Sequence, residues 1–566
     1  MSKNTEKNKP ASGNDTDAAR GERMRYRINK LLASPWSFLP SYKDRYEVLL
    51  QYAQSLTPQQ NYAMTMLLGK DSSRYYPDMP NTAELQFPAV NAVDGKSQIG
   101  WYYFAGTVTA KDGKRYGVLC MLFQSALMPP VMADEFKMTD TDNQIVEVQL
   151  AFSVEGGPFY QIDPPVTAGT SGKVKIADTF CLVTEGGSAE SMKKDSLFPI
   201  RVKAGGADHS GSKPVEMEID LEFSSAKPYL LQGLDGALPL IGDVGTRYYS
   251  IPGIVLDPKK STITLEGKKI ELTGGTFWFD HQWGLAMAPG GAPKHDVMRA
   301  SANLNPTVSA GWDFFVANFN DNRNMTLNSI HDADSLKFVR QTGPTPPPAL
   351  DAPIIGKYMD PFGVQFNVSG TLQIDQWMKT GPSPNPAKFP NSPTWVPHHW
   401  TFTITEGVVP EHLRKLEARA ITNDPNALQF ANGARYVEAA VDYYDANGKV
   451  CGVGYAEAVG YVDTLPILLS LAGLPTDEET VKIFRNPPIT DVLKLESLLF
   501  MLKPERQAEL KRLIACGSFP PTPRPTNCAD GQPAQTSKHN DPTTDFLRIA
   551  LGTLADHSLE TRKIHD

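Results

Sequence analysis

An acid, an imidazole and an indole lie within four residues near the middle of the chain, at Asp280, His281 and Trp283. They end an aromatic run, residues 274–284, in which apolar residues are followed by polar ones and then by glycine. Such a run predicts a β-strand that ends at a polar pocket. Carboxyl and imidazole groups can donate and accept protons, so the first hypothesis is general acid–base chemistry.

Side chains alternate along a strand, and this alternation decides which of these groups can meet. The two predicted faces carry Phe277, Phe279, His281 and Trp283 on one side and Thr276, Trp278, Asp280 and Gln282 on the other. Asp280 and His281 are therefore not predicted to form a side-by-side pair. His281 lies instead among aromatic side chains, where the alternative is a purely structural histidine.

A further acid, Asp313, lies between Trp312 and Phe314 in a second aromatic run. Burial among apolar rings raises the pKa of a carboxyl group, which then stays protonated near neutral pH. Asp313 is therefore the candidate general acid, and the alternative is that it only anchors a loop. Trp283 would shield positive charge that develops on carbon, and His281 would orient the acid or deliver water.

Hairpin signals surround these runs. Asp112-Gly113 separates the apolar segments 101–107 and 116–123, and Asn447-Gly448 separates 436–443 and 451–461. Residues 320–323 form the turn after the run that contains Asp313. Asp-Gly and Asn-Gly between alternating segments are typical of β-hairpins. The candidate groups are thus expected on strands of an antiparallel sheet.

Four motifs in this order resemble the superfamily of carotenoid 1,2-hydratase (hydroxyneurosporene synthase) and AttH-like proteins, which also includes fungal Diels–Alderases and kievitone hydratase. They are an aromatic hairpin at 101–106, Tyr-Ser-x-Pro at 249–252 leading to Trp-x-Asp-His-x-Trp-Gly at 278–284, Gly-Trp-Asp-x-Phe at 311–315, and Gly-x-x-Glu-x-x-Gly-Tyr at 454–461. Gly100, Gly311 and Ala439 depart from the pattern, which argues against a carotenoid hydratase in the narrow sense.

The resemblance implies a mainly β fold in which two lipocalin-like β-barrel halves pack together around a hydrophobic substrate. Many short alternating segments between about residues 98 and 463, punctuated by Gly, Pro, Asn and Asp, agree with this fold. We predict the first half at residues 86–252 and the second at 253–463. Barrels of this kind hold one apolar ligand.

The resemblance also implies an enzyme that needs no cofactor and no metal. Its catalytic roles fall on the positions of His281, Trp283 and Asp313, and Asp280 and Glu438 are expected to be catalytic or structural. The predicted reaction is acid-assisted hydration, elimination or cyclisation of an alkene-rich isoprenoid, terpenoid or polyketide. Substrate-binding residues are predicted among the aromatic side chains Trp101, Tyr103, Trp278, Phe279, Trp312 and Phe315. The alternatives are a Diels–Alderase-type pericyclase and a non-catalytic carrier of an apolar ligand.

Charge and hydropathy exclude several other classes. The 566 residues include 55 Lys and Arg against 63 Asp and Glu, a net charge of −8 that disfavours nucleic acid as a partner. No segment reaches the roughly 18 apolar residues of a membrane span. The polar N-terminus has no secretory signal, and the five cysteines lack zinc spacing. A cytoplasmic location is therefore expected.

The flanks differ in character from the β core. Residues 1–20 are predicted to be a disordered tail, 21–85 a helical extension, and 464–566 a second helical extension with a Pro-rich linker. The first extension contains a basic amphipathic helix that would pack on the barrel or contact an anionic membrane surface. The flanks would cap the barrel or build an oligomer, whose state the sequence does not predict.

Overall fold

The computed structural model describes residues 85–462, with longer gaps at 131–138, 285–310, 332–343 and 382–393 and several shorter ones, together with Leu469, Ser470 and Thr476. The described chain is mainly β, which confirms the predicted fold class. The tail at 1–20 and nearly all of the predicted helical extensions, 21–85 and 464–566, lie outside the described residues.

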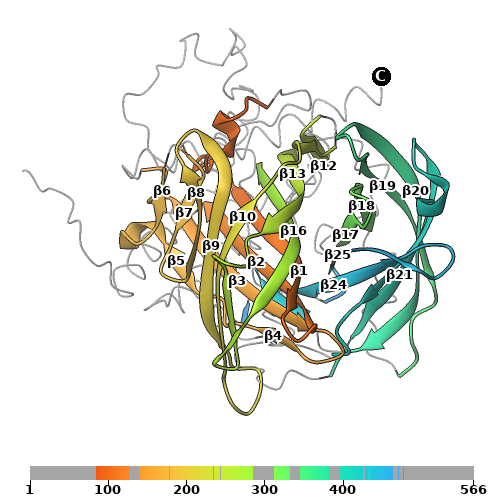
Figure 1. Cartoon of the computed structure of the whole chain (residues 1–566). Coiled ribbons are helices and arrows are strands. Elements are labelled where there is room, and N and C mark those ends of the chain that lie inside the picture. Colours follow the sequence, from red (N-terminus) through yellow and green to blue (C-terminus); the bar gives the residue numbers. More distant parts are fainter. Residues whose placement is uncertain are drawn as a thin grey trace, which may run out of the picture.

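Sixteen antiparallel strands form the first sheet, which curls strongly and is called the curled sheet below (Figure 1). Its main path runs β4-β3-β2-β1-β16-β13-β10-β9-β8-β7-β6. In chain order the strands are β1 (Ile99–Ala110), β2 (Arg115–Ala126), β3 (Gln144–Val154), β4 (Phe159–Gln161), β5 (Val166–Ala168), β6 (Lys175–Ile176), β7 (Cys181–Val183), β8 (Gly187–Lys193), β9 (Ser196–Asp208), β10 (Val215–Ser224), β11 (Leu230–Leu231), β12 (Ala237–Ile241), β13 (Val244–Leu256), β14 (Thr262–Leu265), β15 (Lys268–Ile270) and β16 (Leu272–Gly284).

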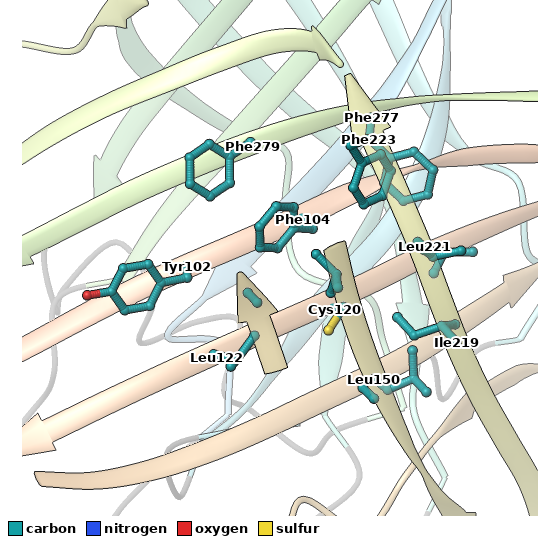
Figure 2. Close-up of a cluster of buried hydrophobic side chains, with 14 of the residues drawn as sticks. Tyr102, Phe104, Cys120, Leu122, Leu150, Ile219, Leu221, Phe223, Phe277 and Phe279 are labelled. Carbon is teal, nitrogen blue, oxygen red and sulfur yellow. The ribbon is translucent and has the colours of Figure 1, made fainter. Parts of the chain in front are cut away.

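The concave face of the curled sheet encloses a core of aromatic and aliphatic side chains. Figure 2 shows Tyr102 and Phe104 of β1 beside Phe279 of β16, with Phe223 of β10 close by. Alternate residues of β1 and β16 point into this core, as the alternating sequence pattern predicts. Their neighbours along each strand therefore point out of the convex face.

Nine antiparallel strands form the second sheet. β22 pairs with both β21 and β24, so eight of the strands close into a ring, called the closed barrel. Each of the eight contributes side chains to one internal core. The strands are β17 (Gly311–Phe319), β18 (Asn324–His331), β19 (Leu350–Met359), β20 (Gln365–Lys379), β21 (Trp395–Glu406), β22 (Lys415–Ala420), β23 (Leu428–Ala431), β24 (Ala434–Tyr444) and β25 (Val450–Val459).

The chain passes from one half to the other between Gly284 and Gly311, later than the predicted boundary after residue 252. The reason is that β16 lies between β1 and β13 and pairs with both. The strand that carries Asp280 and His281 therefore completes the curled sheet. In the described part of the chain, three short 3-10 helices accompany the strands: η3 (Ala89–Asn91), η4 (Gly169–Ser171) and η5 (Glu411–Leu413). No helix in the described residues is both long and apolar enough to cross a membrane.

The convex face of the curled sheet packs against the outside of the closed barrel, and this contact is called the seam. β1 and β2 contact β24, β1 also contacts β25, and β16 contacts β17. Apolar side chains from both halves form the seam cluster, with Trp101 and Trp312 packed against it: Tyr103, Ala105, Leu119, Met121, Ala151, Phe159, Leu230, Tyr248, Trp278, Phe314, Val316, Met359, Ile421, Tyr436, Ala440 and Tyr455.

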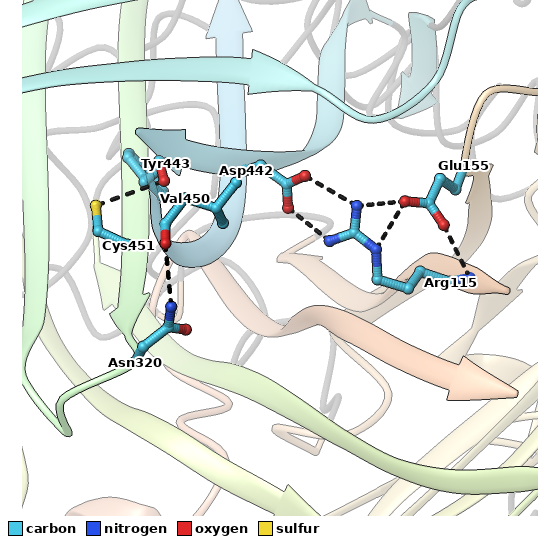
Figure 3. Close-up of polar contacts among 7 residues, drawn as sticks. All are labelled: Arg115, Glu155, Asn320, Asp442, Tyr443, Val450 and Cys451. Atoms are coloured by element: carbon cyan, nitrogen blue, oxygen red, sulfur yellow. Dashed lines mark hydrogen bonds and ion pairs between the residues drawn. The ribbon is translucent and has the colours of Figure 1, made fainter. Parts of the chain in front are cut away.

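An ion-pair bridge spans the seam at one end (Figure 3). The Arg115 guanidinium, from β2, donates to both carboxylate oxygens of Asp442 in β24, at 2.7 and 2.9 Å. Its Nε also donates to Glu155, at 2.8 Å. Two parallel N–H···O bonds to one carboxylate fix orientation as well as distance. Arg115 therefore holds the two halves in one register.

Candidate functional site

A row of cross-strand neighbours crosses the curled sheet at the seam. Tyr103 of β1 lies opposite Asp280 of β16, and Asp280 lies opposite Ser250 of β13. Directly opposed residues of antiparallel strands point to the same face, so this row faces the closed barrel. Trp278 is on the same face of β16 and belongs to the seam cluster.

Asp280 is a buried carboxyl with three neighbouring donors. Its Oδ1 accepts hydrogen bonds from the Ser250 hydroxyl and, at 2.7 Å, from Trp278 Nε1. The Tyr248 hydroxyl also interacts with it. Burial raises the pKa of Asp280 to about 7, although all three donors act in the opposite direction. Asp280 can therefore accept or release a proton near neutral pH.

A second row crosses the closed barrel opposite the first. Phe314 of β17 lies opposite Glu457 of β25, which lies opposite Glu438 of β24. The two rows meet, because the Tyr103 hydroxyl donates to Glu438 Oε2 at 3.2 Å. These two residues are 335 positions apart in the chain. The seam thus brings carboxyl groups of both halves together.

Glu438 is fully buried, and no donor from the described residues reaches its Oε1. Burial raises the pKa of Glu438 well above its usual range, and the neighbouring Glu457 and Asp280 carboxyls raise it further. These influences favour the protonated form of the Glu438 carboxyl. Glu438 is the strongest candidate for a proton donor at the seam.

Glu457 accepts a hydrogen bond from Trp312 Nε1. Burial raises its pKa, while Glu438 and Trp312 lower it. The side chains of Trp101, Gln282, Trp312 and Glu457 are only partly buried. Solvent therefore reaches the part of the seam that these four side chains form, whereas Asp280 and Glu438 lie deeper. The arrangement combines a carboxyl with a strongly raised pKa, Glu438, a carboxyl that titrates near neutrality, Asp280, and aromatic surroundings.

His281 and Trp283 lie on the other side of β16, in the core of the curled sheet, as the alternation predicts. Their ring centroids are 4.3 Å apart. The Tyr249 hydroxyl donates to Asn91 Oδ1 at 2.8 Å and lies 3.1 Å from His281 Nδ1, so Nδ1 carries the proton. No described partner reaches Nε2. Burial lowers the pKa of His281 to about 3, and the ring is neutral.

Asp313 lies in the closed barrel. It is fully buried and accepts the Tyr461 hydroxyl, whose oxygen lies 3.0 and 3.3 Å from the two carboxylate oxygens. Phe315 shares its face of β17, whereas Trp312 and Phe314 point to the seam. Asp313 therefore faces a different core from His281 and Trp283, and the structure does not bring these three residues together.

The predicted substrate-binding residues divide in the same way. Trp101, Tyr103, Trp278 and Trp312 meet at the seam. Phe279 lies in the core of the curled sheet, and Phe315 lies in the core of the closed barrel. Glu457 was not among the predicted site residues, although it is the acid of the motif at 454–461. The sequence nevertheless carried a signal for it: Glu457 shares one face of the strand with Tyr455 and Val459, while Ala456 and Ala458 occupy the other face.

A match to one family model agrees with the AttH-like part of the resemblance. Residues 78–345 match the family model described as AttH-like. A putative AttH from Nitrosomonas europaea matches with a TM-score of 0.48 and 16% identity, over 68% of this chain and 99% of that one. Kievitone hydratase from Nectria haematococca matches with a TM-score of 0.42 and 13% identity, over 68% and 98%. A comparison with curated proteins found no match. Over residues 78–345 the chain is therefore similar to the AttH-like family, and carotenoid 1,2-hydratase is not singled out.

Proposed function

We propose that the chain is a cofactor-independent enzyme that acts on a hydrophobic, alkene-rich substrate by acid-assisted hydration, elimination or cyclisation at the seam. The observation that carries this proposal is the set of carboxyls with raised pKa values, Asp280, Glu438 and Glu457, among aromatic side chains. Protonation of an isolated alkene needs an acid that stays neutral at pH 7 and a site with little water. An isoprenoid, terpenoid or polyketide would match the apolar surroundings.

Hydration would use two of these carboxyls in different roles. The Glu438 proton goes to one alkene carbon, whose π electrons form the new C–H bond, and the other carbon becomes cationic. The faces of Trp101 and Trp312 stabilise that charge by roughly 0.5–1 kcal/mol per ring, because both rings are partly exposed. Water then bonds to the cationic carbon and gives a proton to the Asp280 carboxylate. Elimination is the reverse, and attack by a second alkene in place of water gives cyclisation.

Asp313, His281 and Trp283 are the alternative catalytic set, which rests on the resemblance and on the aromatic neighbours of Asp313 in the sequence. Two observations favour the seam set instead. The Asp313 carboxyl is already engaged by Tyr461 in the core of the closed barrel. His281 is neutral and lies behind β16, away from Asp280. We propose that His281 and Trp283 support β16 from its inner face.

Two steps test this proposal. Mass spectrometry of an organic extract of the purified protein should identify a co-purifying isoprenoid or polyketide. Turnover of that compound or its alkene precursor should then fall about 10²–10⁴-fold in Glu438→Gln and Asp280→Asn, as for loss of a general acid or base. Glu218→Gln, at an exposed position of β10, is the matched control and should retain activity. Full activity of both seam variants, with loss of activity in Asp313→Asn, would place the acid in the closed barrel instead.

A further inference from the structure

A chain of buried hydrogen bonds crosses the seam and ends on Asp280. The backbone N–H of Lys357 donates to Thr326 Oγ1 at 3.3 Å, and the Thr326 hydroxyl donates to Gln232 Oε1 at 3.0 Å. Gln232 Nε2 donates to Ser250 Oγ at 2.9 Å, and the Ser250 hydroxyl donates to Asp280 Oδ1. Thr326 and Lys357 belong to β18 and β19 of the closed barrel, whereas Ser250 and Asp280 belong to the curled sheet.

The direction of this chain is fixed at its far end. A backbone N–H can only donate, so the Thr326 hydroxyl oxygen accepts that hydrogen bond. The Thr326 O–H then donates to Gln232 Oε1. That bond sets the orientation of the Gln232 amide, whose NH₂ group then points at Ser250. Ser250 in turn must donate to Asp280. All four donors therefore point toward the carboxyl, and hydrogen bonds aligned in this way polarise and strengthen one another.

Gln232 is the middle link of this series of hydrogen bonds, between Thr326 and Ser250. The stretch of backbone that leads to Gln232 is held by the closed barrel. The side chain of Gln365 in β20 accepts from the backbone N–H of Leu231 at 3.0 Å and donates to the carbonyl of Tyr229 at 2.7 Å. Gln232 itself is only 2% exposed. Separation of the barrel from the curled sheet would thus remove both the Thr326 contact and the Gln365 clamp.

We infer that Gln232 is a positioning residue that couples the docking of the closed barrel to the protonation of Asp280. The coupling stands on the hydrogen-bond geometry, and only its importance for turnover rests on the proposed function. Each donor aimed at Asp280 favours the carboxylate and opposes the effect of burial. The other titratable groups that face Asp280 are Tyr103 of β1, Tyr248 of β13, Glu457 of β25 and Glu438 of β24. None of these is altered in the variants below.

The test is a pH titration of Asp280 in the full chain by carbon-13 NMR of aspartate labelled at the side-chain carboxyl, with the Asp280→Asn spectrum as assignment. Loss of a donor should raise the titration midpoint. Ser250→Ala should raise it by about one pH unit, Gln232→Met by less, and Thr326→Val by a few tenths. Thr326→Ser keeps the hydroxyl and should restore the parent value.

Thr380→Val is the matched control, because Thr380 is also buried in the closed barrel and hydrogen-bonded, but only to the backbone of Thr394. It should leave the midpoint unchanged. The inference is overturned if Thr326→Val titrates like the parent, or if Thr380→Val shifts the midpoint as much. The titration needs no substrate. A protein that shows the predicted midpoints but no turnover would therefore contradict the proposed function and still support the coupling.

Discussion

Two opposing influences set the pKa of Asp280 near neutrality. Burial disfavours its charged form, and the donors of Ser250, Trp278 and Tyr248 favour it. The pKa of about 7 lies far above the value of about 3.9 in an unfolded chain. Between these two values the folded protein binds more protons than the unfolded one. The contribution of Asp280 to stability must therefore fall as pH rises from about 4 to 7.

Replacement of this one carboxyl should change that pH dependence. Asp280→Asn cannot titrate, so its free energy of unfolding should vary less between pH 4.5 and 7.5, by about 3 kcal/mol relative to the parent. The pKa values of Glu438 and Glu457 are also raised, so these two carboxyls should leave some pH dependence of stability in the variant. Urea unfolding at the two pH values measures the difference, with Asp195→Asn, an exposed site, as control. Parallel curves for parent and Asp280→Asn would show that Asp280 is an ordinary carboxylate.

His281 should have the opposite effect, on the acidic side. Its pKa of about 3 lies below the unfolded value of about 6.5, so the folded protein binds fewer protons between these values. The contribution of His281 to stability should therefore rise with pH through this window. In His281→Gln that rise should be weaker, whereas His412→Gln, at a half-exposed position, should keep it. Equal slopes for parent and His281→Gln in chemical denaturation from pH 4 to 6.5 would mean that His281 charges freely in the fold.

At the scale of elements, the approach of β2 to β24 depends on Gly117. A Cβ atom at this position would lie 2.2 Å from the Cβ of Ala440, well inside contact distance. Gly117→Ala should therefore push the two halves apart and cost about 1–3 kcal/mol of stability, as for other overpacked cores. Gly274→Ala is the control, because nothing lies within 4 Å of a Cβ added there. A melting temperature of Gly117→Ala equal to that of the control would mean that the seam is loosely packed.

The local pattern of the sequence accounts for single strands and their faces. Alternation along residues 274–284 separated Asp280 from His281, and the structure has them on opposite faces of β16. Alternation cannot tell which outward faces meet. Tyr103 reaches Glu438 across 335 residues, and Asp313 and Phe314 point to different cores although they are neighbours. Asp280 and Glu438 could therefore be predicted only as catalytic or structural residues and not as a group with Glu457, and the resemblance pointed to His281, Trp283 and Asp313 as the catalytic set.

At the scale of the whole molecule, two β halves with separate cores place the proposed chemistry between them. Each core is filled by its own side chains. The seam combines carboxyls of raised pKa with partly exposed aromatic residues. The Arg115 bridge and the hydrogen-bond chain through Gln232 both cross this contact. Catalysis and the docking of the halves are therefore expected to be lost together.

The most direct test of the central claim is turnover in heavy water of the substrate identified from the extract. Acid-assisted addition or cyclisation transfers a proton from the enzyme to carbon, so the product should carry one deuterium at a carbon that was part of the alkene. Glu438→Gln should give little product, while Glu218→Gln should give labelled product at the parent rate. For an addition or a cyclisation, efficient turnover by the parent enzyme without deuterium on carbon would contradict acid assistance and indicate a pericyclic reaction in its place.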